Sequence, residues 1–356
     1  MSEGETILVT GAAGFIGFHV ARRLLAEGRH VTGLDNLDPY YDVRLKRARL
    51  SELAAASGFA FEPLNIVDRS AVAALFATRR FSHVVHLAAQ AGVRHSLVDP
   101  HAYVDANVMG FLNVLEGCRR QDIRHLVYAS SSSVYGANGK LPFRTMDRAD
   151  HPLSLYGATK RANELMAHAY AHLFAVPATG LRFFTIYGPW GRPDMAMWLF
   201  TAAICEGRPV RLFHHGKMRR DFTYVDDAVE AVVRILERAP ASEPSRPARP
   251  EEAPASSGAP WGIHNIGNGR PVEIGEIVRL IEQATGREAR RELVPMQPGD
   301  VTETCADVGA LEREIGFRPS TPIEEGIRRF VDWYRRYAAA GADQPPRLPD
   351  PSSVEG

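Results

Sequence analysis

The sequence predicts an α/β fold with a parallel sheet, because short apolar strands alternate with helical segments along most of the chain. Three observations carry this prediction: the alternation itself, a glycine-rich turn directly after the first strand, and an acidic residue at the end of the second strand. A parallel sheet is normally covered by helices on both faces, which gives a doubly wound architecture. We therefore expect a ligand site at the carboxyl ends of the strands.

Segments rich in β-branched and aromatic residues are expected to be strands, at residues 6–10, 30–35, 59–66, 83–89, 124–131, 178–183 and 263–267. Helices are expected between and after them, at residues 21–26, 45–56, 71–78, 107–120 and 152–174. An amphipathic helix should begin near Pro322, with Thr321 as its cap, and should close the core.

The stretch VTGAAGFIG places Gly11, Gly14 and Gly17 directly after the first strand and at the start of a helix. Glycines there permit a tight turn and a close backbone approach to a pyrophosphate, while the helix N-terminus offers free N–H groups. Asp35 closes the second strand, where a carboxylate can bind the adenosine ribose and repel a 2′-phosphate. The combination predicts a Rossmann-like sheet that binds NAD rather than NADP; the alternative is a glycine-rich turn that binds nothing.

The segment SLYGATK holds Tyr156 and Lys160 four positions apart, so both side chains lie on one helical face. An ammonium near a phenol favours the phenolate and lowers a pKa that is normally about 10. Such a base suits hydride transfer from an alcohol, because the hydroxyl proton must leave with the hydride. The spacing also fits a solvated surface pair. Its position after the glycine-rich turn and the serine-ended strand YASSSSVYG favours catalysis.

Composition argues against several function classes. The 42 basic residues balance 42 acidic ones, so an overall basic field for nucleic acid is absent. No apolar run approaches the roughly 18 to 20 residues of a membrane helix, and we expect no signal peptide, because no basic segment precedes an apolar one at the start. Cys118, Cys205 and Cys305 are far apart and odd in number, which favours a cytoplasmic location.

Six motifs together resemble the extended short-chain dehydrogenase/reductase superfamily: TGAAGFIG, HLAAQAGVR, YASSSSVYG, YGATK, LRFFTIYGPWGRPDMA and GKMRRDFTYVDD. Within that superfamily, the chain is most similar to the bacterial UDP-glucuronate 4-epimerases, from about residue 7 to residue 334. The resemblance implies an NAD-dependent isomerase that converts UDP-glucuronate to UDP-galacturonate through a 4-keto intermediate. The net redox change would be zero, so the cofactor would stay bound.

The resemblance also assigns roles by position. Tyr156 would be the base on the sugar 4-hydroxyl, Lys160 would tune it and bind the nicotinamide ribose, and Ser131 would polarise the 4-oxygen. The residues that match substrate-binding positions are Ser132, Ser133, Thr185, Arg192, Arg220 and Asp300. Of these, Arg192 offers the forked donors that suit a sugar carboxylate. Asn107 is similar to the family's structural asparagine.

The expected cofactor contacts lie in the glycine-rich turn, at the carboxyl ends of the next strands and at the catalytic pair. They are Gly11, Gly14, Phe15, Ile16, Gly17, Asp35, Asn36, Asn65, Ile66, Leu87, Ala88, Ala89, Tyr156 and Lys160. Relatives often have an acid at the position of Asn65, where it meets the adenine amine. The amide oxygen of Asn65 can accept the same hydrogen bond.

Three alternative functions stay open. The first is a 4-epimerase for UDP-glucose or UDP-N-acetylglucosamine. The second is a UDP-glucuronate decarboxylase, because the 4-keto acid intermediate is a β-keto acid that loses CO₂ if its carboxylate turns out of the ring plane. The third is a catalytically silent nucleotide-sugar or NAD-binding module, which the intact Tyr, Lys and Ser set disfavours. Ser132 and Ser133 stand where related 4,6-dehydratases carry an Asp-Glu pair, which argues against water elimination.

The expected organisation has an NAD-binding Rossmann domain over residues 1–180, with later returns near 222–238 and 262–268. A smaller C-terminal substrate-binding lobe is expected from residues 181–221 and 269–340. Residues 240–260 and 341–356 are rich in Pro and small or polar residues and are expected to be flexible. Family members are commonly dimers through a four-helix bundle, so we expect a homodimer through residues 107–120 and 152–174.

Overall fold

The computed structural model describes residues 5–242, 257–296 and 301–340. Most of residues 240–260, all of residues 341–356, and Asp300 lie outside this described part. The centre of the molecule is a seven-stranded parallel sheet with the strand order β10-β6-β5-β4-β1-β2-β3. Its strands are β1 (Thr6–Thr10), β2 (His30–Asp35), β3 (Phe59–Pro63), β4 (His83–His86), β5 (His125–Ser131), β6 (Ala178–Phe183) and β10 (Trp261–Ile266). The order from β3 to β6 is that of the doubly wound dinucleotide-binding fold, so the predicted fold class is confirmed.

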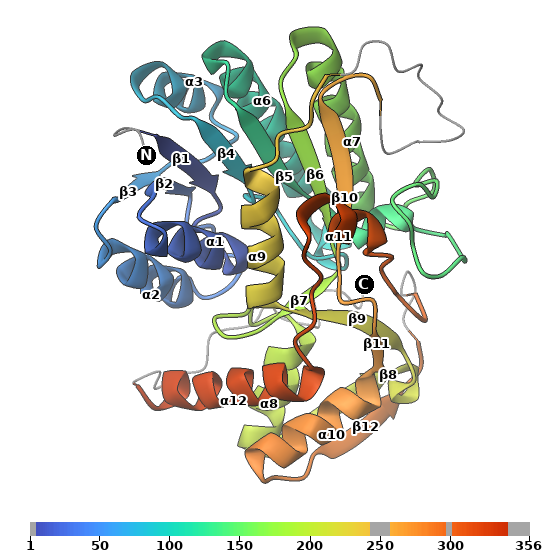
Figure 1. Ribbon diagram of the computed structural model, residues 1–356. Helices are drawn as coiled ribbons and strands as arrows, with labels where there is room; N and C mark the ends of the chain where they lie inside the picture. The colour runs from blue at the N-terminus through green and yellow to red at the C-terminus, as the bar shows by residue number, and fades with distance from the viewer. Residues whose placement is uncertain (1–4, 243–256, 297–300, 341–356) are drawn as a thin grey trace.

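Helices cover both faces of this sheet (Figure 1). One layer holds α1 (Phe15–Ala26), α2 (Val43–Ala54) and α9 (Val225–Leu236), and the other holds α3 (Arg69–Thr78), α6 (Gly110–Gln121) and α7 (Leu155–Phe174). Successive side chains of β1 point to opposite faces of the sheet, so the strand packs against both helical layers. Ile7 and Val9 belong to the core on the α1 side, whereas Leu8 belongs to the core on the α3 side. A strand buried on both faces needs a run of apolar residues, which β1 has at its centre in Ile7, Leu8 and Val9.

A smaller lobe lies below the carboxyl ends of the central strands (Figure 1). It contains the three-stranded sheet of β7 (Thr185–Tyr187), β9 (Arg219–Tyr224) and β11 (Pro271–Glu273), and the parallel pair β8 (Pro209–Phe213) and β12 (Arg290–Val294). Its helices are α8 (Ala196–Glu206), α10 (Ile274–Thr285) and α12 (Ile323–Ala339). The short α11 (Gly309–Ile315) packs instead on β10 and α9. Within the described residues, every helix is too short or too polar to cross a membrane.

Two local expectations differ from the structure. The helix expected at residues 107–120 is preceded by α4 (His95–Val98) and α5 (Pro100–Val104), and it starts as a π-helical turn, η1 (Asp105–Met109), before α6. In that turn Asn107 accepts from the Gln90 N–H at 2.8 Å and donates to the Thr159 hydroxyl at 3.0 Å, which ties η1 to α7. The cap predicted at Thr321 is wrong, because extended Pro322 directly precedes α12 with no side-chain cap. The Thr321 N–H instead donates to Asp227 Oδ2 at 2.7 Å.

Candidate functional site

A cleft of about 540 Å³ opens at the carboxyl ends of the central strands. The glycine-rich turn lines one end, while Tyr156, Lys160 and Arg192 line the other. All the residues expected to contact a cofactor line this cleft: Gly11, Gly14, Phe15, Ile16, Gly17, Asp35, Asn36, Asn65, Ile66, Leu87, Ala88, Ala89, Tyr156 and Lys160. The structure therefore brings together in one cavity residues that lie up to about 150 positions apart in the sequence.

The glycine-rich turn requires glycine for steric reasons. Gly11 has a φ of 71°, and a Cβ there would lie 2.8 Å from the Ala88 nitrogen. A Cβ at Gly17 would lie 2.1 Å from the Gly11 carbonyl oxygen, which no real contact permits. The chain then enters α1 at Phe15 without a side-chain cap, so the first N–H groups of the helix are directed at the cleft end where an anion can bind.

Asp35 lies at the end of β2 and is buried. Its carboxylate accepts from the Leu37 N–H at 2.8 Å and from the Ala13 N–H at 3.2 Å, and Lys46 Nζ lies 3.6 Å away. These contacts hold the carboxylate beside the glycine-rich turn, where a ribose would follow a bound pyrophosphate. Asn65 also lines the cleft, and its amide oxygen already accepts from the Val67 N–H at 3.0 Å.

The start of α7 places Tyr156 against the serine-ended strand. The Ser154 hydroxyl caps α7 by accepting from the Gly157 N–H at 3.0 Å. A Cβ at Gly157 would lie 2.7 Å from the Ser133 carbonyl oxygen, so glycine lets α7 approach the serine turn closely. Tyr156 is thereby brought into hydrogen-bonding contact with the Ser131 side chain.

Burial raises the pKa of Tyr156, while the hydrogen bond from Ser131 and the charge of Arg192 act in the opposite direction. The Lys160 ammonium donates to the Ala129 carbonyl at 3.1 Å, and burial lowers its pKa to about 8. The effect of Lys160 on the pKa of Tyr156, which the sequence predicts, stays a prediction.

Arg192 follows β7 and forms a forked ion pair with Asp194, with Nε 3.0 Å from Oδ1 and Nη2 2.5 Å from Oδ2. The Tyr40 hydroxyl donates to Asp194 Oδ2 at 3.2 Å. Although burial opposes ionisation, Arg192 holds the pKa of Asp194 below its usual range. The guanidinium is therefore fixed in orientation and uses two of its three nitrogens on Asp194.

The other predicted substrate residues lie around the cleft. Ser132 and Ser133 form the short 3₁₀ turn η2 (Ser132–Tyr135), and Thr185 lines a smaller pocket of about 20 Å³ beside Arg192. Arg220 Nη1 donates to the carbonyls of Arg219 at 3.0 Å and Thr302 at 3.3 Å. None of these four belongs to the lining of the main cleft within the described residues, and Asp300 lies outside that part of the chain.

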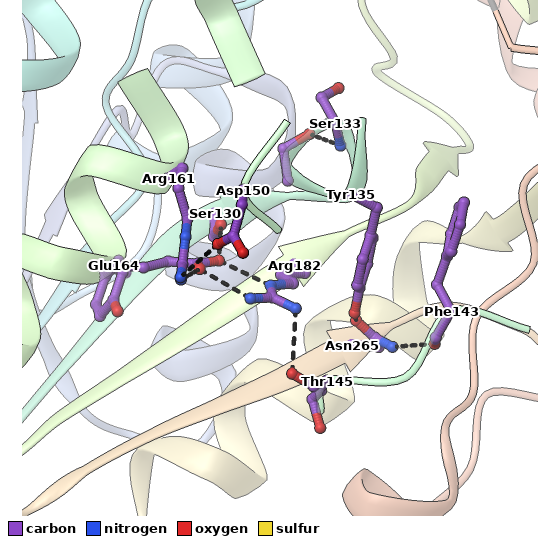
Figure 2. Close-up of polar contacts among 12 residues, drawn as sticks. Ser130, Ser133, Tyr135, Phe143, Thr145, Asp150, Arg161, Glu164, Arg182 and Asn265 are labelled. Atoms are coloured by element: carbon purple, nitrogen blue, oxygen red, sulfur yellow. Dashed lines mark hydrogen bonds and ion pairs between the residues drawn. The ribbon is translucent and has the colours of Figure 1, made fainter. Parts of the chain in front are cut away.

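A buried network under the serine turn was not predicted. Figure 2 shows Glu164 between Arg182 and Ser130: the Ser130 hydroxyl donates to it at 2.6 Å, and Arg182 Nε and Nη2 donate at 2.8 and 2.9 Å. Glu164 thereby ties α7 to β5 and β6. Its position four residues after Lys160, on the same face of α7, was the available sequence signal. No comparable signal indicated Tyr40 or Asp194.

A sequence match to a protein family covers most of the part of the chain that the structure describes. Residues 7–247 match the NAD dependent epimerase/dehydratase family. The chain belongs to this family. The glycine-rich turn and the buried Asp35 of this epimerase/dehydratase fold fit NAD, because the glycines permit a tight turn that any Cβ would block by clashing with the chain's own backbone, and an acid lies beside that turn where a ribose would follow a pyrophosphate.

Named relatives and solved structures of the family narrow the comparison. The chain is 51% identical over 329 residues to a probable UDP-glucuronate 4-epimerase of Rhizobium meliloti (strain 1021), covering 92% of this chain and 96% of the relative. The structure of Bacillus cereus UDP-glucuronic acid 4-epimerase with UDP-glucuronic acid and NAD matches with a TM-score of 0.81 and 31% identity, over 93% of this chain and 99% of that one. Thermotoga maritima UDP-glucose 4-epimerase with UDP-glucose matches with the same TM-score of 0.81 and 29% identity, over 93% and 99% of the two chains. The backbone therefore does not separate the two kinds of sugar.

Proposed function

We propose that the protein is an NAD-dependent UDP-sugar 4-epimerase that interconverts UDP-glucuronate and UDP-galacturonate. The observation that carries the substrate assignment is Arg192, which shares the cleft with Tyr156 and acts on its pKa. Two of the Arg192 nitrogens are used on Asp194, so the third, Nη1, is proposed to meet the sugar carboxylate, whereas a neutral hydroxymethyl group offers it no charge. The relatives named UDP-glucuronate 4-epimerases support the same assignment.

The proposed chemistry starts at Tyr156. The phenolate takes the proton of the sugar 4-hydroxyl, and the Ser131 hydroxyl holds the 4-oxygen. NAD, which the glycine-rich turn, Asp35 and Lys160 would hold in this cleft, would supply a reversible hydride acceptor for C4, so that a 4-keto sugar lies between the two epimers. Tyr156 then gives its proton back to the 4-oxygen, so the sugar is inverted with no net oxidation. Arg192 and Ser131 favour the phenolate against the effect of burial.

Holding the sugar carboxylate is the second task of the site. In the 4-keto sugar, the C5–C6 bond can break with its electron pair moving toward the 4-oxygen, which releases CO₂. We propose that Arg192, with Thr185, Ser132 and Ser133 around it, keeps the carboxylate in the ring plane and prevents this loss. Arg220 and Asp300 are proposed to hold the pyrophosphate and the uridine ribose.

The residue ranges of the two lobes remain a proposal. We propose that residues 1–180, with returns near 222–238 and 262–268, form the NAD-binding domain, and that residues 181–221 and 269–340 form the substrate lobe. The cleft supports this division, because its cofactor end is lined by the first range and Arg192 enters from the second.

We further propose a homodimer. Large apolar side chains are exposed on neighbouring helical elements: Leu97 is 68% exposed, and Leu165 and Leu173 on α7 are 57% and 67% exposed. The elements α4, α5 and α6 all contact α7, so these side chains come from adjacent segments. Monomers rarely leave such apolar groups together in water. Light scattering should give twice the chain mass, and Leu165→Asp should give the chain mass. A monomeric wild type would contradict the dimer.

A cytoplasmic location is proposed from the thiols. Cys118, Cys205 and Cys305 are all free, which a reducing compartment favours. Fractionation of the native host should place the protein with soluble reduced proteins, and recovery with a disulfide-bonded extracellular fraction would contradict the proposal.

Equal amounts of UDP-glucuronate and UDP-glucose offered to the purified protein test the substrate assignment. We expect UDP-galacturonate to form at least about 10-fold faster than UDP-galactose, because one good charge-assisted contact contributes about 1.5–3 kcal/mol. The neutral-sugar alternative predicts the reverse order, and the decarboxylase alternative predicts CO₂ and a UDP-pentose. A silent binding module would yield neither product while still binding NAD.

A further inference from the structure

Arg49 on α2 is a fully buried cation, with 0% of its side chain exposed. Its guanidinium donates to carbonyls and to a phenol: Nη1 to Ala13 at 2.8 Å and to the Tyr41 hydroxyl at 2.7 Å, and Nη2 to Trp190 at 2.6 Å. None of the ion pairs found among the described residues involves Arg49. Burial of a charge without an ion-pair partner opposes folding, and here the hydrogen bonds to carbonyls and to Tyr41 are what offsets that cost.

The two arms of this guanidinium reach two segments whose neighbouring residues, Gly11, Gly14 and Arg192, line the cleft. Nη1 holds the carbonyl of Ala13, which lies inside the glycine-rich cofactor turn between Gly11 and Gly14. Nη2 holds the carbonyls of Trp190 and, at 3.2 Å, Gly191, which directly precede Arg192. A guanidinium holds its donors in one rigid plane and so fixes the two segments at a set distance, whereas an ammonium is a compact charge on a flexible stem.

A second side chain holds the same loop from α1. His19 Nε2 lies 2.8 Å from the Pro189 carbonyl, and burial, aided by the charge of Arg22, lowers the His19 pKa to about 3. The ring is therefore neutral, and because a carbonyl only accepts, Nε2 carries the proton and donates it. Its Nδ1 then accepts from Arg22 Nη2 at 3.1 Å. Three consecutive carbonyls, at residues 189, 190 and 191, are thus held by the first two helices.

The backbone of the loop is also in a conformation that needs support. Trp190 has a φ of 61°, in the left-handed region that non-glycine residues rarely adopt. Its ring packs against Phe18 of α1 and Trp333 of α12, with centroid distances of 5.4 Å in both cases. A strained residue persists only where its surroundings determine it, and here the determining contacts come from the cofactor-binding layer and α12.

We propose that Arg49 is a positioning residue that ties the glycine-rich cofactor turn to the loop carrying Arg192 and so sets where the guanidinium of Arg192 lies in the cleft. Arg192 is one residue beyond the carbonyls that Arg49 holds, and its side chain lies in the same cleft as Tyr156. A shift of the loop would therefore displace the contact to the sugar carboxylate while leaving Tyr156 on α7 in place. The sugar-specific part of this inference rests on the proposed function.

The test compares Arg49→Met with Arg47→Met, an exposed arginine on the same helix. Amide hydrogen exchange is followed in residues 188–195, and kcat/KM is measured for UDP-glucuronate and for UDP-glucose. We expect Arg49→Met to speed exchange in this loop about 10-fold or more and to lower kcat/KM for UDP-glucuronate about 10- to 100-fold. The value for UDP-glucose should change by less than about 2-fold, and Arg47→Met should match the wild type in every measurement.

The inference would be overturned if the amides of residues 188–195 exchanged at the same rate in Arg49→Met as in the wild type. It would also be overturned if kcat/KM fell equally for both sugars. If Arg49→Met does not fold, Arg49→Lys keeps the charge but not the fork, and His19→Phe keeps the ring packing but not the donor. Both should loosen the loop, and wild-type exchange in both would equally overturn the inference. Hydrogen exchange can be measured without turnover. If the wild type is inactive on UDP-glucuronate, the proposed function is refuted, but the exchange rates still test whether Arg49 holds the loop.

Discussion

The two ends of the cleft are built in different ways. The cofactor end depends on backbone geometry at glycines, where Gly17 packs on the Gly11 carbonyl and Gly11 packs on the backbone of Ala88. The sugar end is made by side chains from distant segments: Tyr40 reaches Asp194 across 154 positions, and Arg49 reaches Trp190 across 141. The first end is fixed by backbone sterics and the second by side-chain contacts.

This difference places the binding of the shared cofactor at one end of the cleft and the choice between sugars at the other. Backbone sterics at the cofactor end suit a cofactor that a whole family shares, because few residue types satisfy them. Side-chain contacts at the sugar end can change one at a time, so the same backbone can serve different sugars. Solved structures named for a glucuronate and for a glucose epimerase match this chain with the same TM-score of 0.81, which agrees with that division.

Tyr156 lines the same cleft as the glycine-rich turn and Arg192, and we expect its loss to stop the reaction while the contacts of both remain. We expect Tyr156→Phe to lower turnover of UDP-glucuronate by about 10³-fold or more, because the proton acceptor is removed. Bound NAD, measured by absorbance after denaturation, should stay at the wild-type level. Wild-type turnover in this variant would refute the assigned base, and loss of NAD would show that the hydroxyl supports the cofactor end.

Gly17→Ala tests the cofactor end alone. The added Cβ would meet the Gly11 carbonyl oxygen at 2.1 Å, so the turn must open, and NAD affinity should fall by about 100-fold. The matched control is Gly139→Ala, where a Cβ meets nothing within 4 Å. Calorimetric titration with NAD measures both variants. Similar affinity in the two would remove the steric basis of the cofactor turn.

Lys160→Met tests how much the buried lysine of the cleft destabilises the folded protein. Because burial lowers the folded-state pKa to about 8 from an ordinary 10.5, the charged lysine opposes folding below pH 8 by about 3 kcal/mol. This penalty fades as pH rises from 8 to 10.5, where the lysine becomes neutral in the unfolded state as well. Urea unfolding should therefore find the variant more stable at pH 7, by an amount that shrinks toward pH 10.

The control for that measurement is Lys140→Met, at an exposed loop position, which should stay within about 0.5 kcal/mol of the wild type at every pH. A Lys160→Met difference that is constant between pH 7 and pH 10 would show that the lysine is not destabilised by burial.

Arg192→Ala tests the sugar end. We expect kcat/KM for UDP-glucuronate to fall about 30-fold, which corresponds to about 2 kcal/mol for a lost charge-assisted contact, while the value for UDP-glucose changes little. Some CO₂ should also appear, because the carboxylate of the 4-keto sugar is no longer held. The matched control is Arg208→Ala, an exposed arginine whose partner Glu206 is also two residues away. Equal losses for both sugars would remove the carboxylate role of Arg192.

The unequal construction of the two ends also explains how much could be predicted. The parallel sheet, the glycine-rich turn after the first strand and the position of Asp35 at the end of the second follow from local patterns, and the structure has them as expected. The direction of the Lys160 ammonium and the pairing of Arg192 with Asp194 depend on neighbours that only the folded chain supplies. The π-helical turn at Asn107 is likewise set by its contacts with Gln90 and Thr159, which no helical periodicity records.

UDP-glucuronate carrying deuterium at C4 tests the central claim most directly. If the deuteride leaves C4 and returns to the same carbon, mass spectrometry and NMR should find UDP-galacturonate with deuterium still at C4 and no release of CO₂. UDP-galacturonate that has exchanged C4 deuterium for solvent hydrogen, or a UDP-pentose in its place, would contradict the account.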